Sequence, residues 1–88
     1  MQVLFNKKFL KDLSQIHPKT RTKIEGLVFT KIPAYTSISE IQNLKKLKGY
    51  SHYYRIRFGE YRIGIKVTND ELSFERILHR KEIYKLFL

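Results

Sequence analysis

Two neighbouring stretches in the middle of the chain, residues 53–58 and 61–67, alternate between apolar and polar side chains. Alternation with a period of two is typical of a β-strand that buries only one face. The two residues between the stretches are Gly59 and Glu60, and glycine at the first central position favours a type II′ hairpin turn. The sequence therefore predicts an antiparallel hairpin with one buried face.

The N-terminal third predicts a strand followed by two helices. Met1 to Phe5 contains β-favouring residues and predicts the strand. Asn6 is a good N-cap for a first helix, whose apolar stripe runs from Phe9 to Ile16. His17-Pro18 ends that helix and opens a second one, whose stripe runs from Ile24 to Ile32. The product is an αα-hairpin.

The remaining segments extend the sheet. Pro33 is expected to lie beyond the end of the second helix. Ala34 to Gln42 lacks clean periodicity and is interpreted as a loop or irregular turn that can include a short helix. Leu44 to Leu47 predicts a strand before the hairpin, and a turn at Asn69-Asp70 leads into another strand from Glu71 to Leu78.

Together these elements predict an α+β fold. The N-terminal strand and the αα-hairpin would pack on one face of an antiparallel sheet of three or four strands, and a short helix after Leu78 would end the chain. Residues 1–88 are expected to form a single domain, because a chain of 88 residues cannot bury a second core. The other face of the sheet would be open to water.

The chain is strongly basic, with 18 Lys and Arg against 8 Asp and Glu and a net charge of +10. A field of that size attracts polyanions, so RNA, DNA and an acidic protein are the natural partners. The absence of cysteine excludes disulfides and thiolate metal sites and fits a reducing cytoplasm. No apolar run approaches the roughly 20 residues that span a bilayer, and the N-terminus lacks the order of a secretory signal. We therefore expect a cytoplasmic protein that does not bind membranes.

Much of this charge falls on the predicted open face. Residues 43–62 hold six Lys and Arg and one acidic residue, so they contribute +5 of the net +10. If the apolar members of the two central strands face the helices, strand parity puts the polar members of both strands on the open face. A solvated strand face normally mixes charges of both signs, so we predict a groove for a polyanion, with aromatic rings on which bases can stack. The groove is expected to comprise Lys45, Lys46, Lys48, Tyr50, His52, Tyr53, Arg55, Arg57, Arg62 and Lys66.

The C-terminal segment holds a second group of candidate residues. If a helix begins after Leu78, Arg80 and Tyr84 are four residues apart and share one face, so a guanidinium and a phenol could meet the same substrate atom. Arg76 is in phase with the apolar residues of the last predicted strand. Its charge would enter the core face unless the strand ends, bulges or meets a partner there.

Three spaced motifs resemble the RelE/ParE toxins of type II toxin–antitoxin systems. They are Leu44-Lys-Lys-Leu-Lys-Gly49, Tyr54-Arg-Ile-Arg-Phe-Gly-Glu-Tyr-Arg-Ile63 and Leu78-His-Arg-Lys-Glu-Ile-Tyr84, and the resemblance extends over essentially the whole chain. Resemblance to the RelE branch implies an mRNA interferase, an endoribonuclease that cuts mRNA in the ribosomal A site without a metal or cofactor. It also implies a cognate antitoxin as protein partner, and the charge of this chain predicts that the antitoxin is acidic.

The reaction implied by the resemblance is attack of the RNA 2′-OH on its own adjacent phosphate, which leaves a 2′,3′-cyclic phosphate and a 5′-OH. Arg55 and Arg80 would clamp the phosphate, because the planar guanidinium fork suits a phosphate, and a lysine would neutralise charge. Either Tyr84 or His79 would take the 2′-OH proton. The catalytic positions carried over by motif are Lys46, Lys48, Arg55, Arg80, Tyr84 and His79, and the expected RNA contacts are Lys45, Tyr53, Arg57 and Arg62.

Two rival functions fit the same residues. The ParE branch shares the fold but inhibits DNA gyrase and cuts no RNA, and Arg76-Ile-Leu-His79 is similar to it. The full set of cations together with Tyr84 favours the nuclease, because a gyrase inhibitor would not need that set. A non-toxic RNA-binding module would hold RNA without cleaving it. The sequence has no cysteine nucleophile, glycine-rich phosphate loop or metal-ligand spacing, so no metal site is expected.

Overall fold

The predicted hairpin forms the middle of the sheet. β3 (Tyr53–Phe58) and β4 (Tyr61–Thr68) pair antiparallel, and Gly59 between them takes a φ of +57°. A positive φ at the first central residue is what a type II′ turn requires. The computed structural model describes residues 1–69 and 71–87, and within them β2 (Leu44–Lys46) and β5 (Glu71–His79) extend the hairpin on its two sides.

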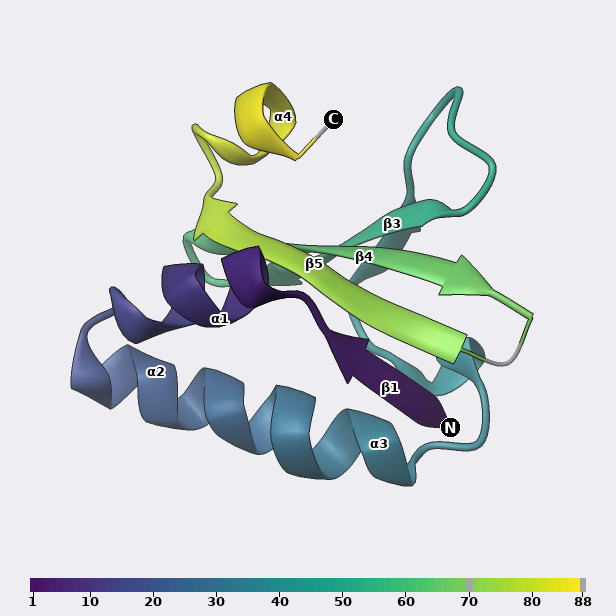
Figure 1. Ribbon diagram of the computed structural model, residues 1–88, viewed down its shortest axis with the longest axis horizontal. Coiled ribbons are helices and arrows are strands. Elements are labelled where there is room, and N and C mark those ends of the chain that lie inside the picture. Colours follow the sequence, from purple (N-terminus) through teal and green to yellow (C-terminus); the bar gives the residue numbers. More distant parts are fainter. Residues whose placement is uncertain (70, 88) are drawn as a thin grey trace.

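The N-terminal strand joins the sheet and does not lie on its face. β1 (Gln2–Phe5) pairs in parallel with β5, which gives the strand order β1-β5-β4-β3-β2 (Figure 1). The predicted α+β fold is confirmed, but the sheet that the described residues form has five strands and not three or four. The pairing register explains this, because Phe5 lies beside Phe74 with ring centroids 5.0 Å apart. β1 therefore widens the apolar face that β5 already presents.

The predicted αα-hairpin covers this apolar face (Figure 1). The Asn6 side chain caps α1 (Lys7–Ser14) by accepting a backbone hydrogen bond, as predicted. The His17 side chain caps α2 (Pro18–Glu25) in the same way, and a proline in the first turn needs no donor. The core lies between the two layers and comprises Phe9, Leu13, Ile16, Ile24, Val28, Ile32, Ile41, Ile56, Ile63, Ile65, Leu72, Phe74 and Ile77.

The second helix runs further than predicted. α2 continues into a π-helix, η1 (Gly26–Lys31), and then into α3 (Ile32–Ala34), so Pro33 lies inside the helical run and not beyond it. In η1 the Ile32 N–H donates to the Leu27 carbonyl, five residues back. This wider turn interrupts the α-helical ladder, so Pro33 occupies the opening turn of a new segment where its missing N–H costs nothing.

Two connections agree with their predictions as far as they are described. Between α3 and β2, the predicted irregular segment contains a short 3-10 helix, η2 (Ile38–Glu40). The Glu40 carboxylate holds the start of this helix by accepting hydrogen bonds from Thr36 and Ser37. Before β5, Asn69 takes a φ of +51°, which suits the predicted turn, whereas Asp70 lies outside the described residues.

The C-terminal helix starts later than predicted and lies on the opposite face of the sheet from α1, α2 and α3 (Figure 1). α4 (Ile83–Leu86) begins at Ile83, because β5 continues to His79 and residues 80–82 form a turn. The Arg80 backbone N–H donates to the Glu60 carbonyl at 2.8 Å, which holds this turn against the hairpin. In the described part of the chain, none of the helices combines the length and the apolar character that crossing a membrane requires.

Candidate nucleic-acid interface

One row of residues crosses four strands on the face opposite α1, α2 and α3. Residues that pair directly across strands share a face. Lys45 pairs with Arg55, which pairs with Gly64. Gly64 in turn pairs with Arg76. We call these four residues the central row, and its three cations lie on either side of a glycine.

Two further rows flank the central row. On one side Tyr53 lies opposite Lys66, whose Nζ stands 5.7 Å from the centroid of the Tyr53 ring. On the other side Arg57 lies opposite Arg62, and this like-charge pair is relieved because Arg62 donates to the Gly59 carbonyl at 2.8 Å. The strand register therefore places these aromatic and cationic residues on the same face as Arg55.

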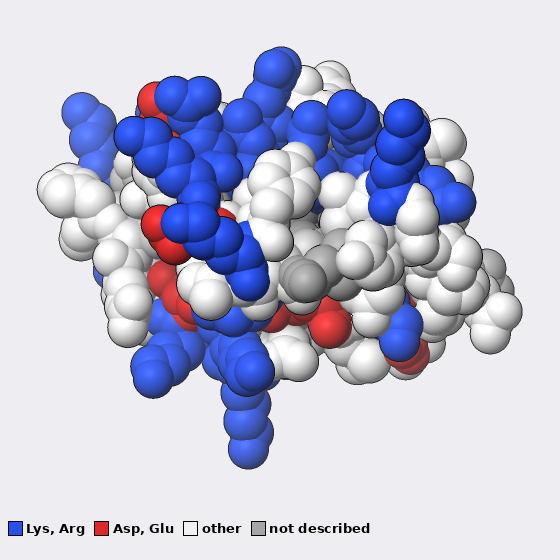
Figure 2. Space-filling view, turned by 90° about the horizontal axis from the view of Figure 1, so that it is seen from above, with Lys and Arg blue, Asp and Glu red and all other residues white. Residues whose placement is uncertain are grey.

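The charge on this side of the molecule is not of one sign throughout. Figure 2 looks onto the side that carries α4 and shows Lys and Arg along the upper border and again at the lower left, with uncharged and some acidic side chains between. The prediction of a face with a single sign is wrong in this respect, because acidic side chains lie on the same side as the cations. On β5 the residue opposite Lys66 is Ser73, whose hydroxyl donates to the Glu75 carboxylate.

Lys45 and Lys46 are neighbours on β2, so their side chains lie on opposite faces of the sheet. Lys46 pairs with Tyr54, whose side chain packs against the core, so Lys46 lies on the face opposite to Arg55. Lys45, one residue earlier, is the lysine that the register places beside Arg55. The predicted convergence of Lys46 with Arg55 is therefore corrected, because strand parity applies to β2 as it does to β3. Lys48 follows the end of β2 and is exposed.

The predicted Arg80 and Tyr84 pair does not form on one helix face. Arg80 belongs to the turn before α4, and its Nε lies 2.9 Å from Glu60 Oε2. The Tyr84 side chain is on α4 and is 60% exposed. Both residues border the open face, but the helix that would align them begins only at Ile83.

His79 is held by contacts that assign its two ring nitrogens. Its ring packs edge-on against Tyr61, with ring centroids 6.2 Å apart. Nδ1 accepts a hydrogen bond from the Lys81 backbone N–H at 3.2 Å. A neutral histidine bound in this way has its N–H on Nε2, which is then available to donate a hydrogen bond.

A β-bulge explains the phase of Arg76. Gly64 pairs with Arg76 while Ile65 pairs with Phe74, so Glu75 is an extra residue and the parity of β5 changes there. Arg76 consequently lies on the open face. Of the three solutions that the sequence allowed, the structure uses both a bulge and a partner, because Asp12 pairs with the guanidinium.

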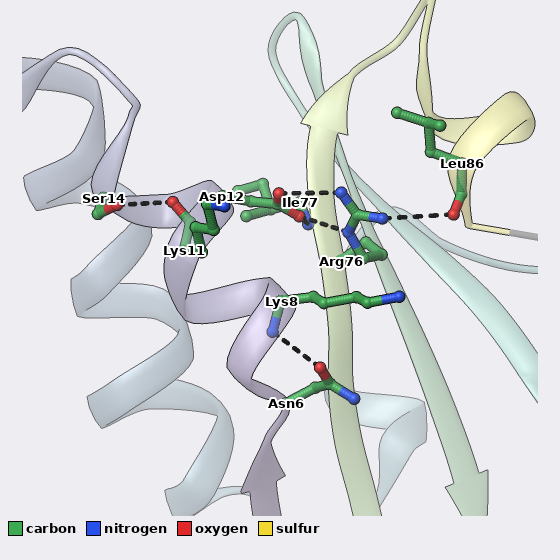
Figure 3. Close-up of polar contacts among 8 residues, drawn as sticks. All are labelled: Asn6, Lys8, Lys11, Asp12, Ser14, Arg76, Ile77 and Leu86. Atoms are coloured by element: carbon green, nitrogen blue, oxygen red, sulfur yellow. Dashed lines mark hydrogen bonds and ion pairs between the residues drawn. The ribbon is translucent and has the colours of Figure 1, made fainter.

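Asp12 and Arg76 join α1 to the edge of β5 (Figure 3). Arg76 Nε donates to Asp12 Oδ2 at 2.7 Å, Arg76 Nη2 donates to Oδ1 at 3.0 Å, and the Ile77 N–H also donates to Oδ2. The hydrogen bond to Asp12 raises the pKa of Arg76. A third nitrogen, Nη1, donates to the Leu86 carbonyl at 3.4 Å and so reaches α4. Arg76 is thus committed to structural contacts.

The aromatic ring of Phe87 lies on Gly64, a contact that the sequence analysis did not identify. A Cβ atom at Gly64 would stand 2.5 Å from the Phe87 ring, so only glycine permits this approach. The ring also meets Tyr53 edge-on, with centroids 5.6 Å apart. Arg55 pairs with Gly64 on the neighbouring strand, and its Nε atom is buried without a hydrogen-bond partner among the described residues. A glycine within a strand, on the open-face parity, was the one signal that could have indicated this contact.

Metal-ion binding would need several ligands close together. Over residues 1–69 and 71–87, no group of three or more His, Asp or Glu side chains is positioned to hold a metal ion.

The sequence of the chain matches known proteins along nearly its whole length. The family described as "ParE toxin of type II toxin-antitoxin system, parDE" matches residues 3–84. The chain is 46% identical to Toxin RelE3 of Methanocaldococcus jannaschii over 88 residues, and the alignment covers 99% of both chains.

Solved structures agree with these sequence matches. The RelB–RelE antitoxin–toxin complex from Methanococcus jannaschii contains a chain with a TM-score of 0.79 and 42% identity, covering 97% of this chain and 99% of that one. The RelBE2 toxin–antitoxin complex from Mycobacterium tuberculosis matches with a TM-score of 0.71 and 20% identity, covering 90% of this chain and 96% of that one. The second likeness concerns the fold alone.

Proposed function

Because this chain belongs to the RelE/ParE toxin superfamily of type II toxin–antitoxin systems, we propose that it is a RelE-type mRNA interferase that cuts mRNA in the ribosomal A site without a metal. The observation that carries the proposal is the central row. Lys45 and Arg55 lie side by side there, and Arg55 has a buried Nε donor without a partner among the described residues. A buried donor without a partner destabilises the protein. That cost is relieved when an anion such as an RNA phosphate accepts a hydrogen bond from the donor.

In the proposed reaction, the RNA 2′-oxygen attacks the adjacent phosphorus and the bond from phosphorus to the 5′-oxygen breaks. Arg55 donates to the phosphoryl oxygens as negative charge builds up. A base takes the 2′-OH proton and an acid protonates the leaving 5′-oxygen. We assign His79 a hydrogen-bond donor role toward the phosphoryl oxygens through its Nε2–H, because its Nδ1 is occupied by the Lys81 N–H. This assignment leaves the base to Tyr84, whose side chain is exposed on α4.

The other basic residues would bind the RNA backbone on either side of the cut. Arg57 and Arg62 lie on the face of Arg55 and can reach flanking phosphates, as can the exposed side chains of Arg80 and Lys48, whereas Lys46 lies on the opposite face of β2. Such contacts contribute affinity that falls as salt concentration rises. In this proposal Arg80 exchanges Glu60 for a phosphate, which costs little because the ion pair is exposed.

The proposed partners follow from the relatives and from charge. One similar chain was solved in the RelB–RelE antitoxin–toxin complex and another in the toxin–antitoxin complex RelBE2. With a net charge of +10, this chain would bind an acidic antitoxin that drapes over the open face or displaces the C-terminal segment. Both the ribosome and such an antitoxin place the protein in the cytoplasm.

A second candidate function is inhibition of DNA gyrase. It is favoured by the family match, which is described as a ParE toxin. A gyrase inhibitor would recognise a protein surface and would not need Arg55 to meet a phosphodiester. The two functions therefore differ in which residues they require.

The proposal is tested by adding the purified protein to programmed ribosomes and locating cuts by primer extension. We expect cuts at the A-site codon, and we expect Arg55→Ala with Arg80→Ala to abolish them while the far-UV circular dichroism spectrum stays unchanged. The matched control is Lys23→Ala with Lys31→Ala, which removes two exposed charges from the α2 and η1 surface and should leave cutting intact. Intact mRNA together with blocked supercoiling would overturn the nuclease in favour of gyrase inhibition. RNA retention without cleavage would overturn it in favour of a binding module.

A further inference from the structure

The connection between β2 and β3, residues 47–52, carries an exposed tyrosine directly after a tight turn. The Tyr50 N–H donates to the Leu47 carbonyl at 3.4 Å, and Gly49 at the third position of this turn takes a φ of +80°. A hydrogen bond from the fourth residue to the first, with a positive φ at the third, is the pattern of a type II turn. Because Tyr50 is the fourth residue, the turn fixes the direction in which its side chain leaves the backbone.

Two further backbone hydrogen bonds close the base of this loop. The Leu47 N–H donates to the Tyr53 carbonyl, and the Val67 N–H donates to the His52 carbonyl, both at 2.9 Å. These bonds continue the pairing of β2 with β3 and of β3 with β4 by one step beyond the strand ends. The sheet therefore holds the loop on both sides, and the loop rises on the same side of the sheet as α4 (Figure 1).

The ring of Tyr50 is anchored on one side and exposed elsewhere. It stands edge-on to the ring of Tyr53, with centroids 6.3 Å apart and planes at 88°. Tyr53 is itself half-buried, because Lys66 Nζ lies 5.7 Å from its centroid and the Phe87 ring meets it edge-on at 5.6 Å. Tyr50 is 47% exposed. Of the two tyrosines, Tyr50 is thus the one with surface left for another ring to stack on.

The surroundings of Tyr50 favour an anionic ligand. Residues 41–59 contain five Lys and Arg and no Asp or Glu. Lys48 is exposed on the same turn, and Lys45 lies opposite Arg55 in the central row. An exposed aromatic ring among cations suits single-stranded RNA, because the ring stacks a base while the cations hold the phosphates on either side of it.

We propose that Tyr50 is the stacking platform for one base of a single-stranded RNA whose phosphate lies at Arg55. This inference rests on the proposed function, since it takes Arg55 as the phosphate-binding residue. Tyr53 and Arg55 share the open face and are about 7 Å apart along β3, and the Tyr50 ring adjoins that of Tyr53, so the two sites suit neighbouring nucleotides of one strand. Tyr50 binds the base and takes no part in proton transfer. The loop of residues 47–52 thereby positions the RNA relative to the bond that is cut.

The test measures, by fluorescence anisotropy at one fixed salt concentration, how tightly the protein binds two fluorescein-labelled RNA hexamers. One hexamer carries six adenines, and the other has the same ribose-phosphate backbone without bases. Wild type should bind the adenine hexamer more tightly than the abasic one. Tyr50→Ala should weaken binding of the adenine hexamer about tenfold and leave binding of the abasic hexamer unchanged. Tyr50→Phe keeps the ring and should bind both hexamers as wild type does.

The matched control is Phe29→Ala, which removes a ring of similar exposure, 43%, from η1 on the other side of the sheet. It should bind both hexamers as wild type does, and circular dichroism checks that every variant is folded. The inference is overturned if wild type does not distinguish the two hexamers, or if Tyr50→Ala loses affinity equally for both. It is also overturned if Tyr50→Phe loses as much affinity as Tyr50→Ala. Unchanged binding of the adenine hexamer by Tyr50→Ala would overturn it in favour of a protein partner for this ring.

Primer extension on programmed ribosomes separates failure of this inference from failure of the proposed function. If wild type cuts mRNA but Tyr50→Ala binds the adenine hexamer normally, the nuclease is supported and the base site is overturned. If binding depends on the bases through Tyr50 but wild type makes no cuts, the proposed nuclease is overturned and Tyr50 remains part of an RNA-binding face.

Discussion

The helices on the two faces of the sheet bury very different numbers of apolar side chains. On one face α1, α2, η1 and α3 insert a set of fully buried side chains, among them Phe9, Ile24 and Ile32. On the other face α4 buries Ile83 completely and Phe87 in part. Each fully buried apolar side chain contributes roughly 1.5–3 kcal/mol, so the first cover is integral to folding whereas the second can open at a small cost. The fold thus separates the face that gives stability from the face that can bind.

Substitution of one phenylalanine on each face tests this difference most strongly. Phe74→Ala removes a fully buried ring from the core and should lower the free energy of unfolding by about 3–5 kcal/mol. Phe87→Ala should lower it by about 1 kcal/mol, because that ring is only partly buried. Urea denaturation followed by circular dichroism measures both values. Similar losses from the two substitutions would mean that α4 belongs to the core, and the comparison of the faces would fail.

The ion pair between Asp12 and Arg76 connects α1 with β5, and through the Leu86 carbonyl also with α4. Its loss should have an intermediate effect on the free energy of unfolding. The side chains are only 12% and 19% exposed, so Asp12→Asn leaves a poorly solvated guanidinium with a weaker acceptor. We expect a loss of about 2 kcal/mol in the free energy of unfolding. Glu25→Gln is the control, since the Arg21 and Glu25 pair at 3.9 Å is more exposed and should contribute well under 1 kcal/mol. Equal effects at the two pairs would show that Asp12 is not a structural link.

The smallest expected effect concerns the segment between α3 and β2. Hydrogen bonds from the Thr36 backbone and side chain and from the Ser37 backbone lower the pKa of Glu40 below 4.5. A carboxyl whose pKa is lower in the folded state stabilises the protein fully above its unfolded pKa, and that stabilisation is lost as pH falls through the folded value. The difference in unfolding free energy between wild type and Glu40→Gln should therefore be present at neutral pH and shrink in acid. A difference that does not depend on pH would contradict this account.

Sequence patterns predicted an element correctly where residues close together in the sequence determine it. Alternation located β3 and β4, and Asn6 and His17-Pro18 located the starts of α1 and α2. The parallel pairing of β1 with β5 joins residues about seventy positions apart and leaves no local mark, so the number of strands was underestimated. The prediction that the second helix ends before Pro33 was wrong, because a proline ends an α-helix but can follow a π turn.

The candidate site was predictable only where strand parity holds without interruption. Parity placed Arg55 on the open face, and the same rule applied to β2 would have chosen Lys45 over Lys46. The bulge at Glu75 shifts that parity by one residue, and a single polar residue in an apolar phase cannot reveal it before the register is known. The contact between Phe87 and Gly64 depends on how a turn directs the chain back over the sheet, which is decided by tertiary packing.

The carboxylate of Asp12 also affects whether a strand from another molecule can add to the edge of β5. β1 pairs with β5 only from Glu71 to Phe74, so within residues 1–69 and 71–87 no strand lies beside the outer edge of β5 from Glu75 onward. Unpaired strand edges recruit strands from other molecules and start aggregation. Asp12 accepts the Ile77 N–H and presents its charge at that edge, and α1 lies alongside, so a side chain blocks the place where a foreign strand would add. We therefore infer that a single acidic residue on a helix disfavours the addition of a foreign strand at this edge.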